Sequence, residues 1–575
     1  MTTTPVQPPV DELTPAVASE LDKAIDELQA GAAAWARLSV GERADLVEAT
    51  HAAIGRQAQR WVQAAVKAKN VPAGPWVGEE WLSGPYATLA GLATLAKTLR
   101  MLAQGRSPLD GVKARVAPGG RVALKMLPED AKQGILLHGF SGEVWLRPGV
   151  TLDQARAAAG LGAKQTSGTG VGLVLGAGNI SSIAPLDVIY ELVAHNRASI
   201  VKLNPTFATL EPVLRDALAP LVEFGVVRVV NGAAAVGGYL ADHPKISHVH
   251  ITGSGATHDA IVWGTGEEGA RRRAQNDPKL RKPITSELGG VSPIIVVPGR
   301  WSKADIRFQA EQVATQRLHN SGHNCIAGQL LILSSDWPQR EEFLAAIREV
   351  FDRLPSRTPW YPGAAARLAN ATATYPSAER HGADGTRLLV EIGLTPDLCT
   401  TEYFAPVLGH TTLPGTGRDF LTAAIAFAND NLAGTLGASI LIKPRDRRRM
   451  GAAFDEALAD LRYGNIGINA WTGVNFFVPG LPWGAFPGHT LENVGSGIGV
   501  VHNARLLADT ERSVVTGAFR PFPRSVFAGE FSLSPRPPWF VTARTADVTG
   551  RRLTRFATKP SWLRLPAVVL SAFRG

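Results

Sequence analysis

Apolar segments that end in glycine, asparagine or proline alternate with helical segments between residues 171 and 255. The strand-like segments are VGLVLGAGN, SIVKLNP, VVRVVNG and VHITGSG, and the helical segments LDVIYELVAHNRA and PVLRDALAPLVEFG lie between them. Strands and helices that alternate at this spacing form a parallel, doubly wound sheet. Since ligands of such sheets bind at the carboxyl ends of the strands, the pattern predicts an α/β fold with a binding edge.

The flanking segments extend this architecture. A second α/β unit is expected after residue 290, with PIIVV, RFQAEQVATQRLHN, IAGQLLIL, GASILI and GNIGIN in turn. Residues 11–105 predict amphipathic helices that cover the sheet, because apolar residues recur there at three and four positions. Between Gly119 and Pro148, RVALKMLP and EVWLRPG predict strands of a hairpin or small meander, which we expect to serve as an oligomerisation arm.

The composition excludes several classes of protein. With 575 residues, 45% hydrophobic and 19% charged, the chain is long enough for two or three packed units and too apolar for a disordered protein. Two cysteines cannot form a disulfide framework, so we expect a reducing cytoplasm. The start MTTTPVQPP lacks the positive and apolar regions of a signal peptide, and no membrane-spanning segment is predicted.

The net charge of +9 is concentrated at the C-terminal end. From Arg520 onward ten Arg or Lys residues stand against two acidic residues, whereas residues 1–519 are close to neutral. The body of the chain is therefore not expected to bind nucleic acid. The aromatic residues of this basic tail favour peripheral contact with an anionic membrane surface. The alternative, which we prefer, is a strap that packs along its own body or a neighbouring subunit, since the helical periodicity of the tail is modest.

Two glycine-containing turns follow strands of the first sheet. Gly176-Ala-Gly178-Asn179 follows one strand, and Gly253-Ser254-Gly255 follows another. Glycine lets a ligand approach the backbone, and amides at a helix start favour a phosphate. Each turn alone is weak evidence for a binding site, but two such turns in one sheet favour a site that binds a dinucleotide.

Cys325, in HNSGHNCIAGQ, is the candidate nucleophile. A free cysteine is more often a buried small hydrophobic residue, but this one is flanked by glycine, histidine and asparagine. Cys399, in PDLCTTEYF, has no such context and is interpreted as structural. His323 could form a dyad with Cys325, but we expect it at the surface, since side chains two positions apart need not meet.

Glu287 stands in TSELGG, directly before the strand VSPIIVV. A solvated loop residue and a general base are the two interpretations of this carboxylate. A loop at the end of a strand, inside a cleft, is the right place for a base.

Taken together, these residues resemble the aldehyde dehydrogenase superfamily over about residues 15–505. The motifs that carry the resemblance occur in the order expected of that family: Asn179, Gly253-Ser254, Glu287-Leu-Gly-Gly, Asn320-x-Gly322-x-x-Cys325, Glu402-x-Phe404-x-Pro406-Val407, Asn429-Asp430 and Gly467-x-Asn469.

The resemblance implies a catalytic role for three residues. Cys325 would attack the aldehyde carbon to give a thiohemiacetal and then a thioester. Asn179 and the backbone N–H of Cys325 would form the oxyanion hole. Glu287 would activate water for thioester hydrolysis.

The resemblance also implies NAD or NADP as the cofactor, held by five residues. Glu402 and Phe404 would hold the nicotinamide ribose and ring, Lys202 the adenosine ribose, and Gly253 and Ser254 the diphosphate. Lys202-Leu-Asn-Pro205 lacks the acidic residue that often holds the ribose hydroxyls, so NAD is favoured over NADP only slightly.

The resemblance further implies a division of the chain into domains and a homo-oligomer. Its parts are a cofactor-binding domain (1–118 and 149–289), the oligomerisation arm (119–148 and 480–505), a catalytic domain (290–479) and a basic C-terminal extension (506–575). Ala177-Gly178 replaces the usual Pro-Trp, which should alter the substrate tunnel.

Three functions remain under consideration. The first is an aldehyde dehydrogenase that releases a carboxylic acid. The second is an acylating member that uses coenzyme A, and the third is a catalytically silent scaffold of the same fold. The presence of Glu287 favours hydrolysis, because acylating members typically lack this base. Retention of Cys325, Asn179, Glu287 and Glu402 argues against a silent scaffold.

Overall fold

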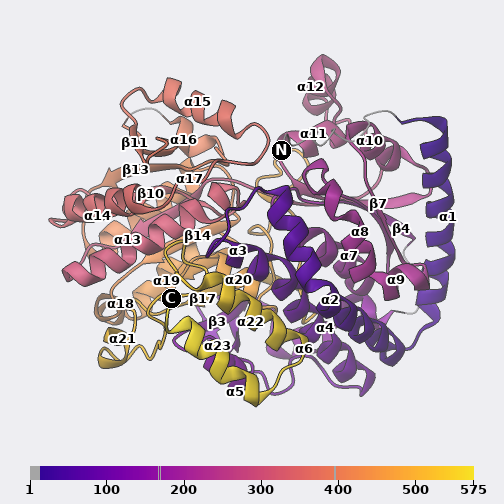
Figure 1. The fold of residues 1–575 in the computed structure, drawn as a ribbon, viewed down its shortest axis with the longest axis horizontal. Helices are drawn as coiled ribbons and strands as arrows, with labels where there is room; N and C mark the ends of the chain where they lie inside the picture. Colours follow the sequence, from indigo (N-terminus) through magenta and orange to yellow (C-terminus); the bar gives the residue numbers. More distant parts are fainter. Residues whose placement is uncertain (1–12, 166–167, 169, 394–395) are drawn as a thin grey trace.

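The computed structural model describes residues 13–165, 168, 170–393 and 396–575. Two sheets with helices packed around them form the molecule (Figure 1). The segment MTTTPVQPP, in which we expected no signal peptide, lies outside the described residues.

The first sheet has six strands. Its core is parallel, as the alternation of strands and helices predicts, and only the short edge strand β16 runs antiparallel to its neighbour β8. In spatial order the strands are β16 (Gly497–Ile498), β8 (Ile284–Leu288), β7 (Ile246–Gly253), β4 (Val171–Leu175), β5 (Ala198–Lys202) and β6 (Val227–Val230).

Helices cover this sheet, and those from the N-terminal region do so as predicted. Helix α1 contacts β4, β5 and β6, and α2 packs against α4 and α8. Ser39 starts α2 through a capping box with Glu42, which satisfies free backbone N–H groups. The helices of this unit are α1 (Pro15–Arg37), α2 (Val40–Ala68), α4 (Ala87–Ala103), α7 (Ile183–Ala194), α8 (Glu211–Ala217), α9 (Ala219–Phe224), α10 (Ala234–Asp242), α11 (Gly255–Val262) and α12 (Gly266–Ala274).

The second sheet has eleven strands and is mixed. A parallel centre is continued on one side by β17 and then by three antiparallel strands from the region 114–146. In spatial order the strands are β1 (Ala114–Ala117), β2 (Arg121–Leu127), β3 (Ser141–Leu146), β17 (Thr510–Thr516), β15 (Asn465–Ile468), β14 (Gly437–Leu441), β9 (Ser292–Val296), β10 (Gly328–Ser334), β13 (Val407–Leu413), β12 (Arg387–Glu391) and β11 (Glu379–His381).

The helices of the second unit bury the faces of its parallel strands. Helix α13 packs against α14 and β10, and α17 packs against α19, β9 and β13. These helices are α13 (Lys303–Leu318), α14 (Arg340–Arg353), α15 (Ala364–Thr374), α16 (Asp397–Thr400), α17 (Gly417–Asn431), α18 (Pro444–Met450), α19 (Ala452–Asp460) and α20 (Gly473–Phe477).

The C-terminal segment is packed onto the body of the protein rather than detached from it. Trp539 and Phe540 are buried, and the Phe540 ring stacks on Phe308 of α13 with centroids 5.4 Å apart. Helix α22 (Ala546–Thr558) contacts α3 (Val77–Trp81), the π-helix η1 (Leu82–Tyr86), α2 and α4. Figure 1 shows this segment in yellow, with α22 and α23 (Leu565–Ala572) near α5 (Ala131–Leu136). The strap interpretation thus describes how the tail lies on its own chain.

No helix in the described part of the chain is both long and apolar enough to cross a membrane.

Candidate active site

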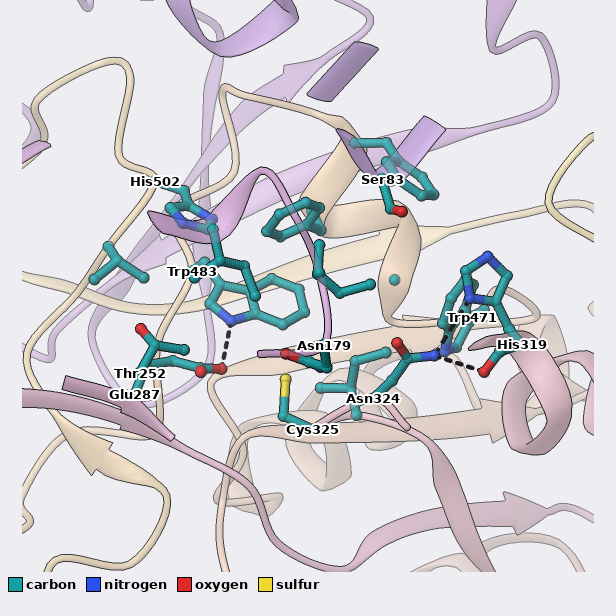
Figure 2. A pocket seen from close by; sticks show the side chains of 17 residues that line it. Ser83, Asn179, Thr252, Glu287, His319, Asn324, Cys325, Trp471, Trp483 and His502 are labelled. Carbon is teal, nitrogen blue, oxygen red and sulfur yellow. Dashed lines mark hydrogen bonds between the residues drawn. The ribbon is translucent and has the colours of Figure 1, made fainter. Parts of the chain in front are cut away.

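A cavity whose empty space, with the open solvent at its mouth included, is about 510 Å³ lies between the two units. The six-stranded sheet contributes Asn179, Thr252 and Glu287, and the segment before β10 contributes Cys325 (Figure 2). The remaining wall is largely apolar and includes Ile180, Ile183, Ile326, Trp471, Phe476, Phe477, Trp483 and Val501. The fold therefore brings the three predicted catalytic residues to one cavity.

Cys325 follows a tight turn at the end of α13. In that turn Asn320 and Ser321 have φ of 54° and 55°, and Gly322 has φ of 79°. Left-handed backbone of this kind reverses the chain sharply, and glycine adopts it without strain. A Cβ on Gly322 would also crowd the backbone of Ala405. The turn thereby presents the half-buried Cys325 to the cavity.

The environment of Cys325 keeps its thiol protonated. Burial raises the pKa of the thiol well above its usual value, and the carboxylates of Glu287 and Glu402 raise it further. The thiol also hydrogen-bonds to Glu287. A thiolate is the nucleophilic form, so Cys325 needs a nearby base to become reactive.

Glu287, which is hydrogen-bonded to that thiol, is the candidate base. It lies within β8 rather than in a loop, contrary to our expectation, and pairs in register with Thr252 of β7. Its Oε1 accepts a hydrogen bond of 2.9 Å from the indole N–H of Trp483. Burial raises the pKa of Glu287 to about 7, although the hydrogen bonds from Trp483 and Cys325 act in the opposite direction. A carboxylate with this pKa can accept and return protons near neutral pH.

Asn179 stands beside the turn that carries Cys325. Its Nδ2 donates to the carbonyl oxygen of His323 at 3.0 Å, and its own carbonyl oxygen accepts from Asn320 at 3.1 Å. An amide nitrogen carries two protons, so one N–H of Asn179 remains for a group in the cavity.

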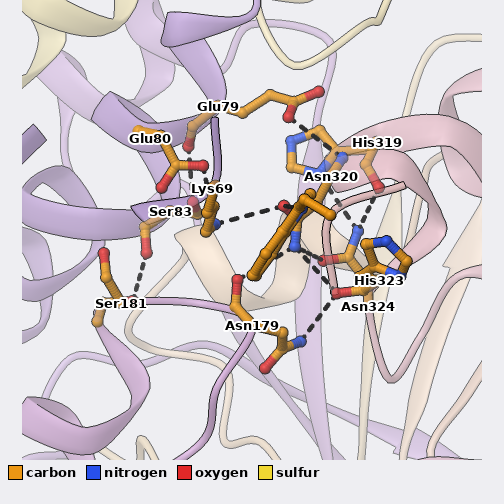
Figure 3. A network of polar contacts seen from close by, with 12 residues as sticks. Lys69, Glu79, Glu80, Ser83, Asn179, Ser181, His319, Asn320, His323 and Asn324 are labelled. Atoms are coloured by element: carbon orange, nitrogen blue, oxygen red, sulfur yellow. Dashed lines mark hydrogen bonds and ion pairs between the residues drawn. The ribbon is translucent and has the colours of Figure 1, made fainter. Parts of the chain in front are cut away.

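Sequence reasoning missed the buried ionic network behind this turn (Figure 3). Lys69 and Glu80 form an ion pair of 2.8 Å in which both side chains are fully buried, and Lys69 also donates to Asn320 at 3.3 Å. Glu79 pairs with Arg357 at 2.6 Å and accepts from the backbone N–H of Asn320. The network thus binds the turn at the backbone N–H of Asn320 and at the side chain of the same residue.

The predicted surface position of His323 is wrong. The residue is completely buried, and its Nδ1 lies 2.7 Å from the carbonyl oxygen of Phe404. Burial lowers the pKa of His323 to about 3, so the ring is neutral. Its ring packs against Phe404, Tyr361 and Trp360. Cys399 is buried in the second unit, which agrees with a structural role.

Glu402 and Phe404 lie in the segment before β13, next to the turn that carries Cys325. Burial raises the pKa of Glu402 to about 8, while Arg317 acts to lower it. Among the described residues, Oε1 of Glu402 has no hydrogen-bond partner. A Cβ on Gly289 would collide with this carboxylate, so the glycine leaves room for it. Phe404 has a left-handed backbone, with φ of 44°, and packs edge-on against Tyr361.

Lys202, Gly253 and Ser254 gather at the carboxyl ends of the parallel strands. Lys202 ends β5, and its Nζ donates to the carbonyl oxygens of Gly232 at 2.8 Å and Leu203 at 3.3 Å. Burial lowers the pKa of Lys202 to about 8. Gly253 ends β7, and Ser254 caps α11 by accepting from the backbone N–H of Thr257.

The comparisons with known proteins agree with this geometry. The aldehyde dehydrogenase family model matches residues 188–370, a segment that contains Glu287 and Cys325. A putative aldehyde dehydrogenase of Staphylococcus saprophyticus is 32% identical over 136 residues, which are 24% of this chain and 25% of that protein. One from Staphylococcus haemolyticus is 31% identical over the same length. The chain thus aligns with about a quarter of the length of the curated relatives it matches.

Solved structures extend the likeness to most of the chain. The NAD-dependent aldehyde dehydrogenase from Sinorhizobium meliloti has a TM-score of 0.56 and 19% identity, and the match covers 88% of each chain. The NADP-dependent glyceraldehyde-3-phosphate dehydrogenase from Bacillus halodurans has a TM-score of 0.56 and 19% identity over 87% of this chain and 91% of that one. The fold is that of the aldehyde dehydrogenases.

Residues 188–370 thus resemble the aldehyde dehydrogenase family in sequence, and most of the chain shares the fold of that family.

The residues that this superfamily would use for a dinucleotide have the chemistry to hold one. Glu402 presents an unpaired buried oxygen to which ribose hydroxyls can donate. Lys202 carries three donors, of which the structure uses two on backbone carbonyls. The N-terminus of α11, next to Gly253 and Ser254, offers backbone N–H groups to a diphosphate.

A second group that sequence reasoning missed lies behind Glu287. Asp187 of α7 accepts from Thr252 at 2.9 Å and from His502 at 3.1 Å, and it lies 3.5 Å from His250. Burial alone would raise the pKa of Asp187, but the two histidines lower it to about 2. His502 also lines the cavity. No sequence motif relates these residues, which come from three distant segments.

Proposed function

We propose that this chain oxidises an aldehyde to a carboxylic acid with NAD(P)⁺ through a covalent intermediate on Cys325. The observation that carries the proposal is the presence of Cys325, Glu287 and Asn179 on one largely apolar cavity. A nucleophile, a base with a pKa near neutrality and an oxyanion donor are the parts that such a reaction requires.

In the first stage Glu287 accepts the thiol proton and Sγ of Cys325 bonds to the aldehyde carbon. The carbonyl π electrons move to the oxygen, and the N–H groups of Asn179 and of the Cys325 backbone stabilise the resulting charge. When bound, NAD(P)⁺ supplies the hydride acceptor that turns this thiohemiacetal into a thioester.

In the second stage Glu287, after releasing the thiol proton to solvent, acts again as a base. It takes a proton from water, the hydroxide oxygen bonds to the thioester carbon, and the carbon–sulfur bond breaks. The acid leaves, and the Cys325 sulfur is reprotonated. We assign the cofactor contacts to Lys202, Gly253, Ser254, Glu402 and Phe404, with NAD slightly preferred over NADP.

Two rival functions are separated by one experiment. An acylating enzyme would pass the thioester to coenzyme A, and a silent scaffold would turn over nothing. Purified protein is mixed with a panel of aldehydes and either NAD⁺ or NADP⁺, with and without coenzyme A, and reduced cofactor is followed by absorbance. We expect turnover without coenzyme A. Turnover only in its presence would support the acylating enzyme, and none in any mixture would support the scaffold.

We further propose a homo-oligomer, with the arm at 119–148 and 480–505 and the domain division given above. The support is the edge strand β1 (Ala114–Ala117), which lies just before the arm and pairs with its strand β2; the outer backbone of β1 is unpaired within the described chain, and its Val116 is 84% exposed. Such an edge invites a strand or side chains from a second copy. Sedimentation analysis tests this, since a monomer at every concentration would contradict it.

We also propose a peripheral contact of residues 520–575 with an anionic membrane. Seven Arg or Lys residues from Arg544 to Arg574 form no ion pair within the described residues. Nine large apolar side chains are exposed among the described residues, and eight lie on or beside this tail: Ile135, Val526, Phe527, Phe531, Leu533, Trp562, Leu563 and Leu570. Cations beside exposed apolar groups are typical of surfaces that bind anionic lipid.

A further inference from the structure

A second apolar cavity, here called the tail groove, lies between the C-terminal segment and the body of the protein. Its empty space, which includes the open solvent at its mouth, is about 740 Å³, and it is walled by α5, η1, α22, α23 and residues 533–539. Helices α22 and α23 pack together, and α23 contacts α5 (Figure 1). The groove therefore depends on residues beyond Asn503, the part of the chain without a counterpart in the sequence motifs of the family.

The lining of the tail groove selects against charged and strongly polar ligands. Its lining residues include no acidic residue, lysine or arginine, and burial lowers the pKa of His138, so that its ring is neutral at neutral pH. The other polar side-chain groups are the hydroxyls of Tyr86, Ser534 and Thr549 and the indole N–H of Trp539. The rest of the wall is apolar and includes Leu136, Phe140, Trp539, Leu553, Val568 and Val569. An extended hydrocarbon gains from burial in such a site, whereas a phosphate or carboxylate loses its hydration.

The groove and the catalytic cavity share a wall. Phe477 lines both of them, and its ring centroid lies 6.1 Å from that of Phe476 and 6.4 Å from that of Trp539. Helix η1 also separates them, since Ser83 lines the catalytic cavity while Leu82 and Tyr86 line the groove. One layer of side chains thus separates Cys325's cavity from a long apolar site that opens toward the exposed residues Ile135 and Leu533.

We infer that the tail groove holds the hydrocarbon chain of the substrate, so that the substrates are long-chain aliphatic aldehydes. The aldehyde carbon lies at Cys325, and the chain enters the groove past Phe477, whose ring must turn to open the way. This inference rests on the proposed function and adds to it the class of aldehyde. The C-terminal segment is then the part of the protein that determines specificity.

The first test is the dependence of kcat/KM on chain length, from acetaldehyde through hexanal and decanal to dodecanal. Each methylene buried in the groove should raise kcat/KM by up to about fourfold, since burial of one methylene contributes about 0.8 kcal/mol. Val569→Trp fills the groove and should lower kcat/KM for dodecanal at least tenfold while leaving acetaldehyde unchanged. Ala567→Trp places the same side chain on the exposed side of α23 and is the matched control.

A binding measurement keeps the inference testable if turnover is absent. The uncharged probe N-phenyl-1-naphthylamine should fluoresce on binding to the full-length protein, and dodecanol should displace it. Val569→Trp should weaken this binding, whereas Ala567→Trp should not. Circular dichroism spectra that match those of the wild type would show that both variants are folded.

The outcomes separate the inference from the proposed function. Turnover of short aldehydes without any gain from chain length would overturn the inference and leave the proposed function standing. Loss of dodecanol binding in Val569→Trp with unchanged dodecanal turnover would also overturn it, because the groove would then hold an independent apolar ligand. Dodecanol binding that depends on Val569, with no aldehyde turned over, would support the groove as a hydrocarbon site and contradict the proposed function.

Discussion

The indole N–H of Trp483 donates to Oε1 of Glu287 at 2.9 Å, across 196 positions of sequence. This hydrogen bond stabilises the charged form of the carboxylate and therefore lowers a pKa that burial raises. The rate of thioester hydrolysis is thus expected to depend on Trp483.

Replacing this indole should move the pH dependence of turnover. Protonated Glu287 cannot accept a proton, so wild-type steady-state turnover should rise with pH through about 7. Trp483→Phe keeps an aromatic ring but removes the donor, which should shift the midpoint upward by about one unit, as expected for a hydrogen bond to a charged group. The measurement is kcat against pH with the best aldehyde. An unchanged midpoint would show that the hydrogen bond does not tune Glu287.

The two proposed roles of Glu287 differ in their effect on the first turnover. Since the proposed first stage uses Glu287 to deprotonate Cys325, Glu287→Gln should slow the burst of reduced cofactor as well as the later steady-state turnover. Rapid-mixing absorbance measures the burst. A burst with the wild-type rate, followed by slow turnover, would show that Glu287 serves only the hydrolysis stage.

Cys325→Ser should abolish aldehyde oxidation and leave dinucleotide binding largely intact. The sulfur supplies the covalent step, whereas the residues we assign to the cofactor lie on other elements. Calorimetric titration with NAD⁺ and turnover assays should be run on the same preparation, with Cys399→Ser as the matched control. Turnover close to that of the wild type would eliminate Cys325 as the nucleophile.

Discrimination between the two cofactors should be weak. Lys202-Leu-Asn-Pro205 offers no carboxylate to repel a 2′-phosphate, so we expect NAD to be preferred by less than about a thousandfold, which corresponds to about 4 kcal/mol. The ratio of kcat/KM for the two cofactors gives the preference directly. A larger preference would require a repelling group elsewhere in the site.

The ion pair of Lys69 and Glu80, behind the turn that carries Cys325, should contribute strongly to stability. Lys69→Met leaves a fully buried carboxylate without its partner, which should lower the free energy of unfolding by about 3–5 kcal/mol. Replacing both residues with apolar ones should cost much less. Lys67→Met, at an exposed position of α2, is the control, and denaturant unfolding is the measurement. A single variant as stable as the control would contradict the prediction.

Membrane contact can be tested without disturbing the core. Phe527→Ser combined with Leu563→Ser should reduce co-sedimentation with anionic vesicles, whereas Val116→Ser, also at an exposed apolar position but far along the sheet, should not. Binding should also weaken near about 0.5 M salt, where the Debye length is about 4 Å. Equal sedimentation of all variants, or binding to neutral vesicles alone, would contradict the proposed contact.

The parts of the molecule that could be predicted from sequence are those with a local pattern. Strand and helix periodicities correctly predicted β4, β5, β6 and β7 of the six-stranded sheet, and the carboxyl ends of these strands indicated where Asn179 would lie. Strand β8, which carries Glu287, was not predicted. The order of the family motifs along the chain then added Cys325 to the predicted active site. Their roles in catalysis stay predictions.

What could not be predicted depends on contacts between distant segments. Lys69 and Asn320 are separated by 251 positions, and Lys69 belongs to a helix whose polar residues look solvated in sequence. The polar neighbours of His323 in the sequence indicated a surface position for its side chain. The left-handed backbone of residues 320–322 instead directs that segment into the interior. In the sequence Asp187 is likewise an isolated acidic residue of a mostly apolar helix. Only the fold shows that His250 and His502 lie beside it.

Strand β17 lies between β3 and β15, so residues 510–516 complete a sheet that begins at residue 114. Until the ribosome has released this strand, β3 and β15 each present an open hydrogen-bonding edge, and pairing over such a sequence separation is slow. The nascent protein must therefore persist for most of its synthesis with an unfinished sheet. Its yield in a cell is expected to depend on chaperones that shield open strand edges, and a chain that terminates before Thr510 should aggregate rather than fold.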